Sequence, residues 1–500
     1  MTHYDLVVLG TGSGNTIVNR TFADWSCAII ERRTFGGTCI NRGCIPSKMF
    51  AHPATVLDEA AEGGRLGVRT TANGADWPAV RDRVFGRIDP DVEDAAAFRE
   101  GQDHVTVYAG EARFTAPRTL SVQLESGETV EVSGDQVVIA AGSRPVVPPI
   151  EGLDTLRAPA TAPPMRPDDP GAADWYTSDE VMRIPELPRR LAVLGGGYVG
   201  VELAHVFAAY GSQVTQVDVA DTLISNQDAE VATMFTRFAR EQWDVRTGTS
   251  LERVEKTDSG VVLHLSGDQA GSGTVEVDAL LLAVGRKPNG DRLDVEKAGV
   301  EVDDDGIVVV DELQRTSAEG VWALGDVSSH TPLKHSANHD ARVVKHNLHH
   351  VDDPAQMVAA DHEHVPSAVF SHPQVASVGL TEEQAREQGI DLAVGRHTYA
   401  EIAYGWAMED DHLGPNGDNT DAQGADLEHF VKLLGDRATG RLVGAHLIGP
   451  QASVLIQPLI MAISQGVEIG GLARSMYWIH PALTEVVENA LLKLEADLDR

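Results

Sequence analysis

The stretch Tyr4-Asp-Leu-Val-Val-Leu-Gly10-Thr-Gly-Ser-Gly-Asn15 decides the fold. An apolar strand runs into a glycine-rich turn, a helix is expected next, and a second strand follows at Cys27 to Glu31. This is a β-α-β dinucleotide-binding pattern, because glycines permit a tight turn, a helix start binds pyrophosphate, and an acid after the second strand reaches a ribose hydroxyl. The third glycine position holds Asn15, which predicts a helix that is packed less closely or displaced.

The same pattern recurs around residue 190. The strand Leu191 to Leu194 leads into Gly195-Gly-Gly-Tyr-Val-Gly200, a helix is expected from Val201, and the strand Gln213 to Asp218 follows. Two such folds in one chain predict two bound dinucleotides.

The remainder of the chain predicts a third kind of unit. Alternating segments such as Ser367 to Phe370 and Phe430 to Leu434, with helices from residue 452, indicate a C-terminal α+β domain. The predicted fold class is α/β, with two Rossmann-like dinucleotide-binding domains plus this C-terminal α+β domain. We expect a first fold from 1–150 and 288–358, a second from 151–287, and the C-terminal domain from 359–500. Two stretches, 154–175 and 407–426, are expected to be surface insertions.

Composition restricts the partners. Net charge is −35, with 40 basic residues, of which only eight are Lys. Such a charge repels nucleic acid and anionic membranes, so neither is expected as a partner. It also favours adaptation to high internal salt, where self-repulsion is screened. Neither a signal peptide nor a membrane span is recognisable, which predicts a cytoplasmic protein.

The chemistry is expected in Gly36-Gly-Thr-Cys39-Ile-Asn-Arg-Gly-Cys44-Ile-Pro-Ser-Lys48. Cysteines five apart in a straight helix have Cα atoms about 8 Å apart, whereas a disulfide requires roughly 4.4–6.8 Å. The segment therefore cannot be one straight helix, and a glycine such as Gly43 can supply the break. Cys44 would then lie near a helix start, where the pKa of a thiol is lowered. No nearby residues complete a zinc site, so no metal is expected.

This segment resembles the redox-active disulfide of the class I pyridine nucleotide-disulfide oxidoreductases, and the resemblance covers nearly the whole chain. It implies that Cys39 is the interchange thiol that attacks a substrate disulfide and that Cys44 is the charge-transfer thiol beside a flavin. Lys48 would lie near the flavin N5 and pair with Glu202.

The resemblance also implies two cofactors and a homodimer. The residues expected to bind FAD are Gly10, Gly12, Gly14, Glu31, Thr38, Ala141, Gly142, Gly325 and Asp326. Those expected to bind the nicotinamide dinucleotide are Gly195, Gly197, Tyr198, Gly200, Asp218 and Gly285, with Tyr198 covering the flavin until nicotinamide arrives. His480, held by Glu485, would exchange a proton with Cys39 of the other subunit.

The resemblance also implies a small-molecule disulfide as substrate, and the sequence leaves its identity open. The motifs are closest to the mycothione reductases and bis-γ-glutamylcystine reductases. The acidic composition ranks bis-γ-glutamylcystine first, mycothione second and lipoamide third. A non-catalytic flavin- and NAD(P)H-binding sensor is the alternative from another class.

The choice of nicotinamide rests on conflicting features. Asp218 and Gly200 favour NADH, because an acid binds a 2′-hydroxyl and repels a 2′-phosphate. Reductases of low-molecular-weight disulfides generally use NADPH, and this resemblance makes NADPH the expected reductant.

Overall fold

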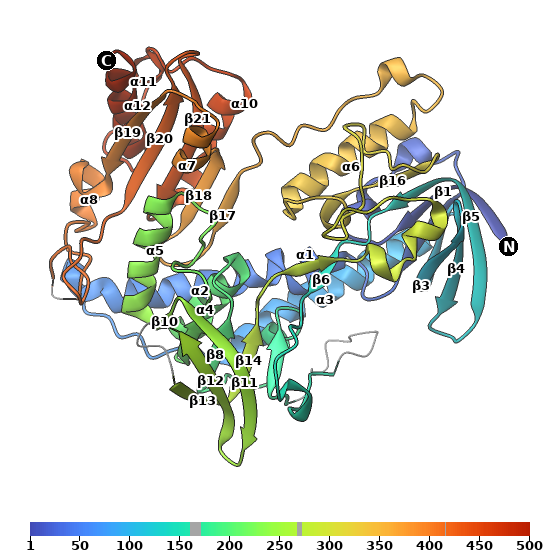
Figure 1. The fold of residues 1–500 in the computed structure, drawn as a ribbon, viewed down its shortest axis with the longest axis horizontal. Helices are drawn as coiled ribbons and strands as arrows, with labels where there is room; N and C mark the ends of the chain where they lie inside the picture. The colour runs from blue at the N-terminus through green and yellow to red at the C-terminus, as the bar shows by residue number, and fades with distance from the viewer. Residues whose placement is uncertain (161–171, 268–272, 416) are drawn as a thin grey trace.

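A computed structural model describes residues 1–160, 172–267, 273–415 and 417–500. Three parts surround a central region in Figure 1. The N-terminal part lies on the right, the part around residues 175–282 lies below, and the C-terminal part lies at the upper left. The predicted fold class is confirmed: two dinucleotide-binding folds are joined to a C-terminal α+β domain.

The first sheet has six strands and combines parallel and antiparallel pairing. Its strands are β1 (Thr2–Leu9), β2 (Cys27–Glu31), β3 (Val105–Ala116), β4 (Thr119–Leu124), β5 (Thr129–Ile139) and β16 (Val321–Ala323). β3 and β5 are long enough to serve two roles, because one half of each pairs in parallel with β2 or β1 and the other half pairs with β4. β2, β1, β5 and β16 are parallel, so their carboxyl ends meet at one edge.

The second sheet is parallel and carries an antiparallel extension. Its strands, in spatial order, are β10 (Asp244–Arg246), β9 (Gln213–Val217), β8 (Arg190–Leu194), β14 (Ala279–Leu282) and β7 (Trp175–Thr177). The extension consists of β11 (Thr249–Thr257), β12 (Gly260–Gly267) and β13 (Gly273–Val277). Two short strands, β6 (Ser143–Pro145) and β15 (Arg286–Pro288), link the two folds.

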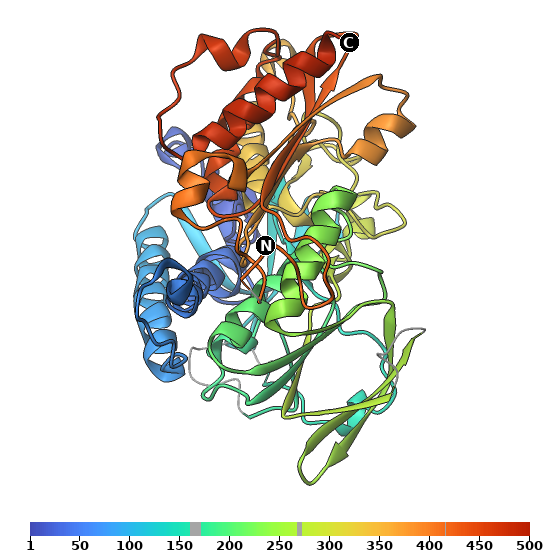
Figure 2. The ribbon, with the colours of Figure 1, turned by 90° about the vertical axis from the view of Figure 1, so that its left-hand side faces the viewer.

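Helices surround these sheets. The N-terminal and middle helices are α1 (Gly37–Arg42), α2 (Cys44–Glu62), α3 (Trp77–Glu100), α4 (Tyr198–Ala209), α5 (Ala229–Gln242) and α6 (Lys334–Leu348). Figures 1 and 2 both show α2 and α3 side by side, and α2 also packs on α4 of the second fold. The aromatic rings of Phe50, Trp77 and Phe207, one from each of these helices, meet in this shared core, where Phe50 stacks on Trp77 and Phe207 is tilted against Trp77. α2 is therefore fixed between the two folds.

The C-terminal domain is built on a five-stranded antiparallel sheet. The strand order is β17 (Ser367–Val369), β18 (Val375–Gly379), β21 (Arg441–Ile448), β20 (Phe430–Asp436) and β19 (Leu392–Thr398). Its helices are α7 (Glu382–Glu387), α8 (Ala403–Ala407), α9 (Ala452–Leu455), α10 (Gln457–Ser464), α11 (Leu472–Ser475) and α12 (Thr484–Leu498). α12 packs across β19 and β20 (Figure 2). The predicted strands at Ser367 and Phe430 are confirmed.

The described residues of 407–426 lie mainly at the surface, as expected, although Asp410 and Asp421 are buried and Asp410 accepts a hydrogen bond from His429. One local expectation is corrected. An α-helix was expected between the first glycine turn and β2. The described residues there form only two 3-10 turns, Gly14–Thr16 and Arg20–Phe22. Part of the other expected insertion, 154–175, lies outside the described residues. No helix in the described ranges has the length and apolar character needed to cross a bilayer.

Candidate active site

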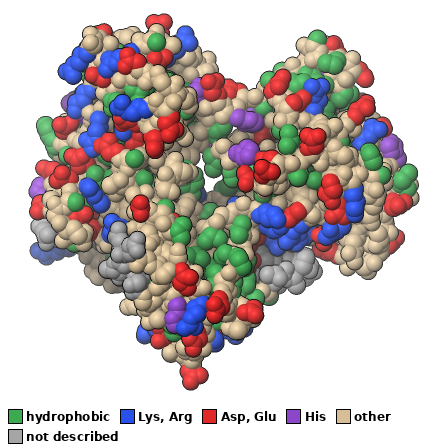
Figure 3. All heavy atoms as spheres, viewed as in Figure 1, with side chains coloured by type: hydrophobic (Ala, Val, Ile, Leu, Met, Phe, Trp, Pro, Cys, Tyr) green, Lys and Arg blue, Asp and Glu red, His purple; other side chains and the backbone are tan. Residues whose placement is uncertain are grey.

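A single cavity of about 1280 Å³ opens at the carboxyl ends of the parallel strands of both dinucleotide-binding folds. Figure 3 shows a hollow at the centre of the molecule, between the three parts. Ligands of α/β folds bind at such strand ends. The cavity wall contains both glycine turns together with Cys39 and Cys44, so the residues predicted for two cofactors and one redox centre meet in one space.

The first glycine turn is shaped by close backbone approach. Gly10 has a φ of 104°, and a Cβ there would lie 2.4 Å from the carbonyl oxygen of Ala140. Glu31 closes the turn, because its Oε2 accepts hydrogen bonds from the backbone N (2.9 Å) and the hydroxyl (2.6 Å) of Thr11. A Cβ on Gly12 would meet nothing within 4 Å, which leaves open space for a pyrophosphate. The chain around this turn therefore fits an FAD.

Asn15, at the third glycine position, has a specific partner. Nε of Arg99, from the end of α3, donates to Oδ1 of Asn15 at 2.8 Å, and its Nη2 donates to the backbone oxygen of Asn15 at 2.7 Å. The close packing expected of the third glycine is made by Gly14, one residue earlier, since a Cβ there would lie 2.5 Å from the Cβ of Ala140. The segment is thus held by a buried arginine rather than by a helix of its own.

The second glycine turn leads directly into α4. Gly195 has a φ of 116°, and a Cβ on Gly200 would lie 2.2 Å from the Gly195 carbonyl oxygen, so α4 can start close to the strand. Asp218 faces this turn, with Oδ2 accepting from Gly196 N at 2.5 Å and Oδ1 from Ala220 N at 2.7 Å. A Cβ on Gly197 would meet nothing within 4 Å. This turn fits a second dinucleotide.

The redox segment is broken where the cysteine spacing predicts. α1 ends at Arg42 and α2 begins at Cys44, and Gly43 between them has φ −136° and ψ −117°. The side chain of Asn41 fixes the start of α1 by donating to the backbone oxygens of Phe35 (2.8 Å) and Gly37 (2.9 Å). Both cysteines are thiols in this structure and lie within hydrogen-bonding contact of each other.

The electrostatics distinguish the two thiols. The hydrogen bond from Cys39, helped by the nearby ammonium of Lys48, lowers the pKa of Cys44 to about 7 against the effect of burial. The same hydrogen bond, together with burial, raises the pKa of Cys39. Cys44 is therefore the thiol that ionises near neutral pH, and Cys39 needs a base to become a nucleophile.

The Lys48 and Glu202 pair joins the two folds at this point. Nζ of Lys48 lies 2.6 Å from Oε2 of Glu202, and Oε1 of Glu202 accepts a hydrogen bond from the backbone N of Phe370 at 2.9 Å. The ammonium also lies 4.7 Å from the centre of the Phe370 ring. These contacts fix the charge at the cavity wall beside Cys44.

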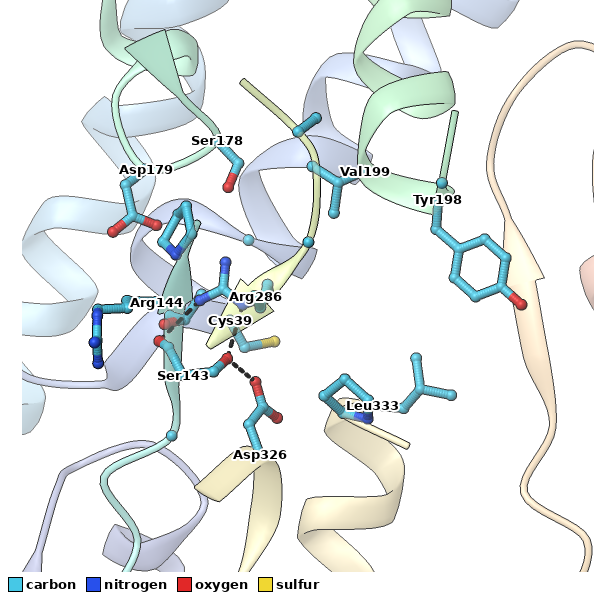
Figure 4. Close-up of a pocket in the computed structure, with 18 of the residues that line it drawn as sticks. Cys39, Ser143, Arg144, Ser178, Asp179, Tyr198, Val199, Arg286, Asp326 and Leu333 are labelled. Atoms are coloured by element: carbon cyan, nitrogen blue, oxygen red, sulfur yellow. Dashed lines mark hydrogen bonds between the residues drawn. The ribbon is translucent and has the colours of Figure 1, made fainter. Parts of the chain in front are cut away.

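The remaining FAD-side residues are tied together by polar contacts (Figure 4). Oδ2 of Asp326 accepts a hydrogen bond from the Ser143 hydroxyl at 2.6 Å, and Nε of Arg286 donates to the same hydroxyl at 2.8 Å. Other predicted cofactor residues line the cavity nearby, namely Thr38, Ala141, Gly142, Gly285 and Gly325. Ser143 and Arg286 directly follow the predicted residues Gly142 and Gly285 but were not themselves predicted to bind a cofactor.

His480 is placed apart from this assembly. Its Nδ1 lies 2.6 Å from Oε1 of Glu485, as the resemblance implies. Its side chain is 72% exposed and does not line the cavity of its own chain. The structure thus brings most of the predicted site residues to the cavity wall, whereas Gly14 and Gly200 pack behind the two turns and His480 and Glu485 lie elsewhere.

One cation of the site was missed. Lys334 is the first residue of α6, lines the cavity, and donates from Nζ to the Ser13 hydroxyl at 2.8 Å. In the part of the chain that the structure describes, it forms no ion pair with a carboxylate. The proximity of its charge lowers the pKa of both Cys39 and Cys44, although other effects are larger. The only sequence signal was a lysine shortly after Gly325-Asp326.

Comparisons with known proteins agree with this architecture. Residues 4–344 match the family described as pyridine nucleotide-disulphide oxidoreductase, and residues 365–491 match its dimerisation domain.

Individual relatives span the whole chain. Mycothione reductase of Mycobacterium tuberculosis (strain ATCC 25618 / H37Rv) is 45% identical, covering 99% of this chain and 100% of its own length. Dihydrolipoyl dehydrogenase of Thermus scotoductus is 33% identical, with 97% and 96% covered. The HOCl-induced flavoprotein disulfide reductase RclA from Escherichia coli has a solved structure that aligns with a TM-score of 0.78, 28% identity and 99% coverage of both chains.

Proposed function

The chain belongs to the pyridine nucleotide-disulphide oxidoreductase family, and we propose that it reduces the disulfide of a low-molecular-weight thiol, with mycothione as the first candidate substrate. It is an NAD(P)H-dependent flavoprotein disulfide oxidoreductase with FAD as its flavin. The observation that carries the proposal is the meeting of both glycine turns with Cys39 and Cys44 in one cavity. The full-length similarity to mycothione reductase reverses the ranking by composition, which put bis-γ-glutamylcystine first.

The proposed reaction balances two electrons and two protons. Held at the first glycine turn, FAD would supply to the disulfide of Cys39 and Cys44 the two electrons delivered by a nicotinamide dinucleotide held at the second turn. The Cys39 thiolate attacks one substrate sulfur, forms a mixed disulfide and releases one thiol. The Cys44 thiolate then attacks Cys39, which releases the second thiol and re-forms the protein disulfide.

A shared site in a homodimer completes this chemistry. Cys39 has a raised pKa and requires a base, whereas His480 is exposed on the chain that carries it. Tyr477 and Ile479, just before His480 in the chain, expose apolar side chains that a subunit interface would cover. We therefore assign the proton exchange to His480 of the partner subunit, with Glu485 fixing the orientation of its ring.

The proposed reductant is NADPH, as the family resemblance implies, and NADH is the alternative that Asp218 favours. Both oxygens of Asp218 already accept backbone hydrogen bonds, so the carboxylate is held at the end of β9. A 2′-phosphate placed there would be repelled, and high salt would weaken that repulsion.

Bis-γ-glutamylcystine is the second candidate, because the charge of −35 and the scarcity of Lys are features of proteins adapted to high salt. This disulfide carries four carboxylates, whereas mycothione carries none. Salt should therefore raise kcat/KM for the former, as repulsion from the acidic protein is screened, and change it little for the latter.

The test is a steady-state panel with the purified holoenzyme at low salt and in molar KCl. Mycothione, bis-γ-glutamylcystine, glutathione disulfide and lipoamide are each assayed with NADPH and with NADH. We expect the highest kcat/KM with mycothione. Highest activity with lipoamide would overturn the proposal, and a flavin that NAD(P)H reduces without turnover of any disulfide would favour the sensor.

Mixed dimers test the shared site. Cys39→Ser and His480→Gln subunits should each have little disulfide reductase activity, since loss of a positioned acid-base group costs about 10²–10⁴-fold. Mixing them should restore activity, because half the sites in a mixed dimer carry both intact groups. No recovery despite demonstrated subunit exchange would exclude the shared site.

A further inference from the structure

The hydroxyl of Tyr198 is a meeting point for three side chains at the cavity wall. Tyr198 is the first residue of α4, and Figure 4 shows its ring extending from the helix start along the edge of the cavity. Its oxygen accepts hydrogen bonds from Nδ2 of Asn226, at 3.0 Å, and from Nε2 of Gln227. The hydroxyl of Ser367 lies 3.4 Å away. The phenol is thus held at its far end as well as at its Cα.

The two amide donors belong to one segment, which is buried at Gln227 and exposed at Asn226. Asn226 and Gln227 both line the cavity and lie between β9 and α5. Gln227 is buried, and the next residue, Asp228, is paired with the buried ammonium of Lys432 at 2.8 Å. The third contact, Ser367, belongs to β17 and lies 2.9 Å from the hydroxyl of Ser377. The phenol therefore bridges the second fold and the C-terminal sheet.

A strained backbone position places the donors. Ile224 is buried and has a φ of 44°, a conformation that is unfavourable for a β-branched residue. Its backbone N donates to the oxygen of Gly196 in the glycine turn at 2.7 Å, and its oxygen accepts from the backbone N of Gln227 at 2.9 Å. Such strain persists where the surrounding structure determines it, and it gathers at functional sites. The backbone of Ile224 thus links the second glycine turn to the residues that hold Tyr198.

We propose that Asn226 and Gln227 form a latch that holds Tyr198 closed and thereby sets the affinity for the nicotinamide. The inference rests on the proposed function, in which Tyr198 covers the flavin face that the nicotinamide must reach. Opening requires the phenol oxygen to give up both amide hydrogen bonds. The apparent Kd for the nicotinamide dinucleotide is the intrinsic Kd divided by the open fraction, so a firmer latch weakens binding without altering hydride transfer.

Anaerobic stopped-flow reduction of the flavin in the holoenzyme tests the latch. Gln227→Leu and Asn226→Ala should each lower the apparent Kd for NADPH about 2- to 10-fold, the range for one lost hydrogen bond, and leave the limiting rate of flavin reduction unchanged. Tyr198→Phe keeps the ring, removes the bonded oxygen, and should have an effect in the same direction. Gln227→Leu added to Tyr198→Phe should then cause no further change.

A matched control separates the latch from general destabilisation. Gln242→Leu removes a glutamine that donates to the backbone oxygens of Phe238 and His372 and does not line the cavity, so it should leave the Kd for NADPH unchanged. An equal effect of Gln227→Leu with and without the Tyr198 hydroxyl would overturn the latch. So would a lower Tm or FAD content in Gln227→Leu at an unaltered Kd.

Flavin fluorescence of the oxidised holoenzyme gives a readout that needs neither nicotinamide nor disulfide. A covering phenol quenches the flavin, so Gln227→Leu and Tyr198→Phe should both be brighter than the parent. If neither NADPH nor NADH reduces the parent flavin, the proposed function fails, while the fluorescence still decides the latch. Unchanged fluorescence in both variants would overturn the latch whatever the disulfide panel shows.

Discussion

The two glycine turns begin with a similar backbone conformation but have different support. Gly10 and Gly195 have φ values of 104° and 116°, and a Cβ on either would lie 2.4 Å from a backbone carbonyl oxygen. Beyond Gly195 the chain forms the 12-residue α4, whereas beyond Gly10 it forms only two 3-10 turns. A glycine pattern thus determines the turn, and the packing partners determine whether a helix comes after it.

The partners differ in kind. α4 is supported by its own apolar residues, since Val201, Leu203 and Ala204 are all buried. The segment after Gly10 is supported from elsewhere, through Arg99 bound to Asn15 and through Ser13, which contacts α6. We therefore expect the FAD turn to depend on distant side chains and the nicotinamide turn to depend on local helix packing.

Alanine at the first glycine of each turn should separate the two turns most strongly. Gly10→Ala forces a Cβ against Ala140 and should yield protein without bound FAD and without activity. Gly195→Ala should retain FAD and lose flavin reduction by NADPH. FAD absorbance per chain and anaerobic reduction measure both effects. Gly211→Ala is the control, because Gly211 has a φ of 107° but a Cβ there meets nothing within 4 Å. Loss of FAD in Gly195→Ala would show that the turns are not independent.

Replacing Arg99 tests whether distant support matters to the FAD turn. Arg99→Met removes two charge-assisted hydrogen bonds to Asn15 from a buried position, a loss of about 3 kcal/mol or more. We expect weaker FAD binding and a lower Tm, with an unchanged Kd for NADPH once FAD is saturating. FAD titration of the apoprotein measures the first effect. FAD affinity equal to that of the parent would mean that Asn15 needs no such support.

The sequence predicted those parts of the site that depend on local geometry. The break at Gly43 followed from the spacing of Cys39 and Cys44, and the positions of Glu31 and Asp218 followed from the ends of their strands. The same reasoning failed for the helix expected after Gly10. The segment is held instead by the buried Arg99, which lies 84 residues beyond its partner Asn15.

Some contacts between residues far apart in the sequence could be predicted only from the family resemblance, and others could not be predicted. Lys48 and Glu202, 154 residues apart, were paired by resemblance. Asn226, Gln227 and Lys334 belong to no recognisable motif, and only the folded chain brings them to the cavity.

Replacing Asp218 tests whether the acid at the nicotinamide turn sets the preference between NADPH and NADH. Asp218→Ser removes the carboxylate that accepts from Gly196 and Ala220, together with its negative charge. The ratio of kcat/KM for NADPH to that for NADH should rise by the equivalent of about 1–3 kcal/mol. Asp221→Ser, an acid on the same segment that does not line the cavity, is the control. An unaltered ratio would mean that Asp218 does not face the adenosine ribose.

Lys334 gives the smallest expected effect and connects the FAD turn with the thiols. Its ammonium binds Ser13 of that turn and helps to lower the pKa of Cys44, while Lys48 on α2 is paired with Glu202. Thiolate-to-flavin charge transfer in the two-electron-reduced enzyme requires ionised Cys44, so the band should grow as pH rises through about 7. Removing a nearby positive charge destabilises the thiolate, so Lys334→Gln should move the midpoint of this rise upward by roughly 0.5–1 pH unit.

The charge-preserving variant distinguishes electrostatics from packing. Lys334→Arg retains a cation and should keep the midpoint close to that of the parent, whereas Lys334→Met should behave like Lys334→Gln. Screening adds an independent check, because the difference between parent and Lys334→Gln should shrink in molar KCl to the extent that the ammonium is accessible to solvent. If Lys334→Gln lowers FAD content but leaves the midpoint unchanged, Lys334 supports only the FAD turn, and the two turns differ in packing rather than in their link to the redox centre.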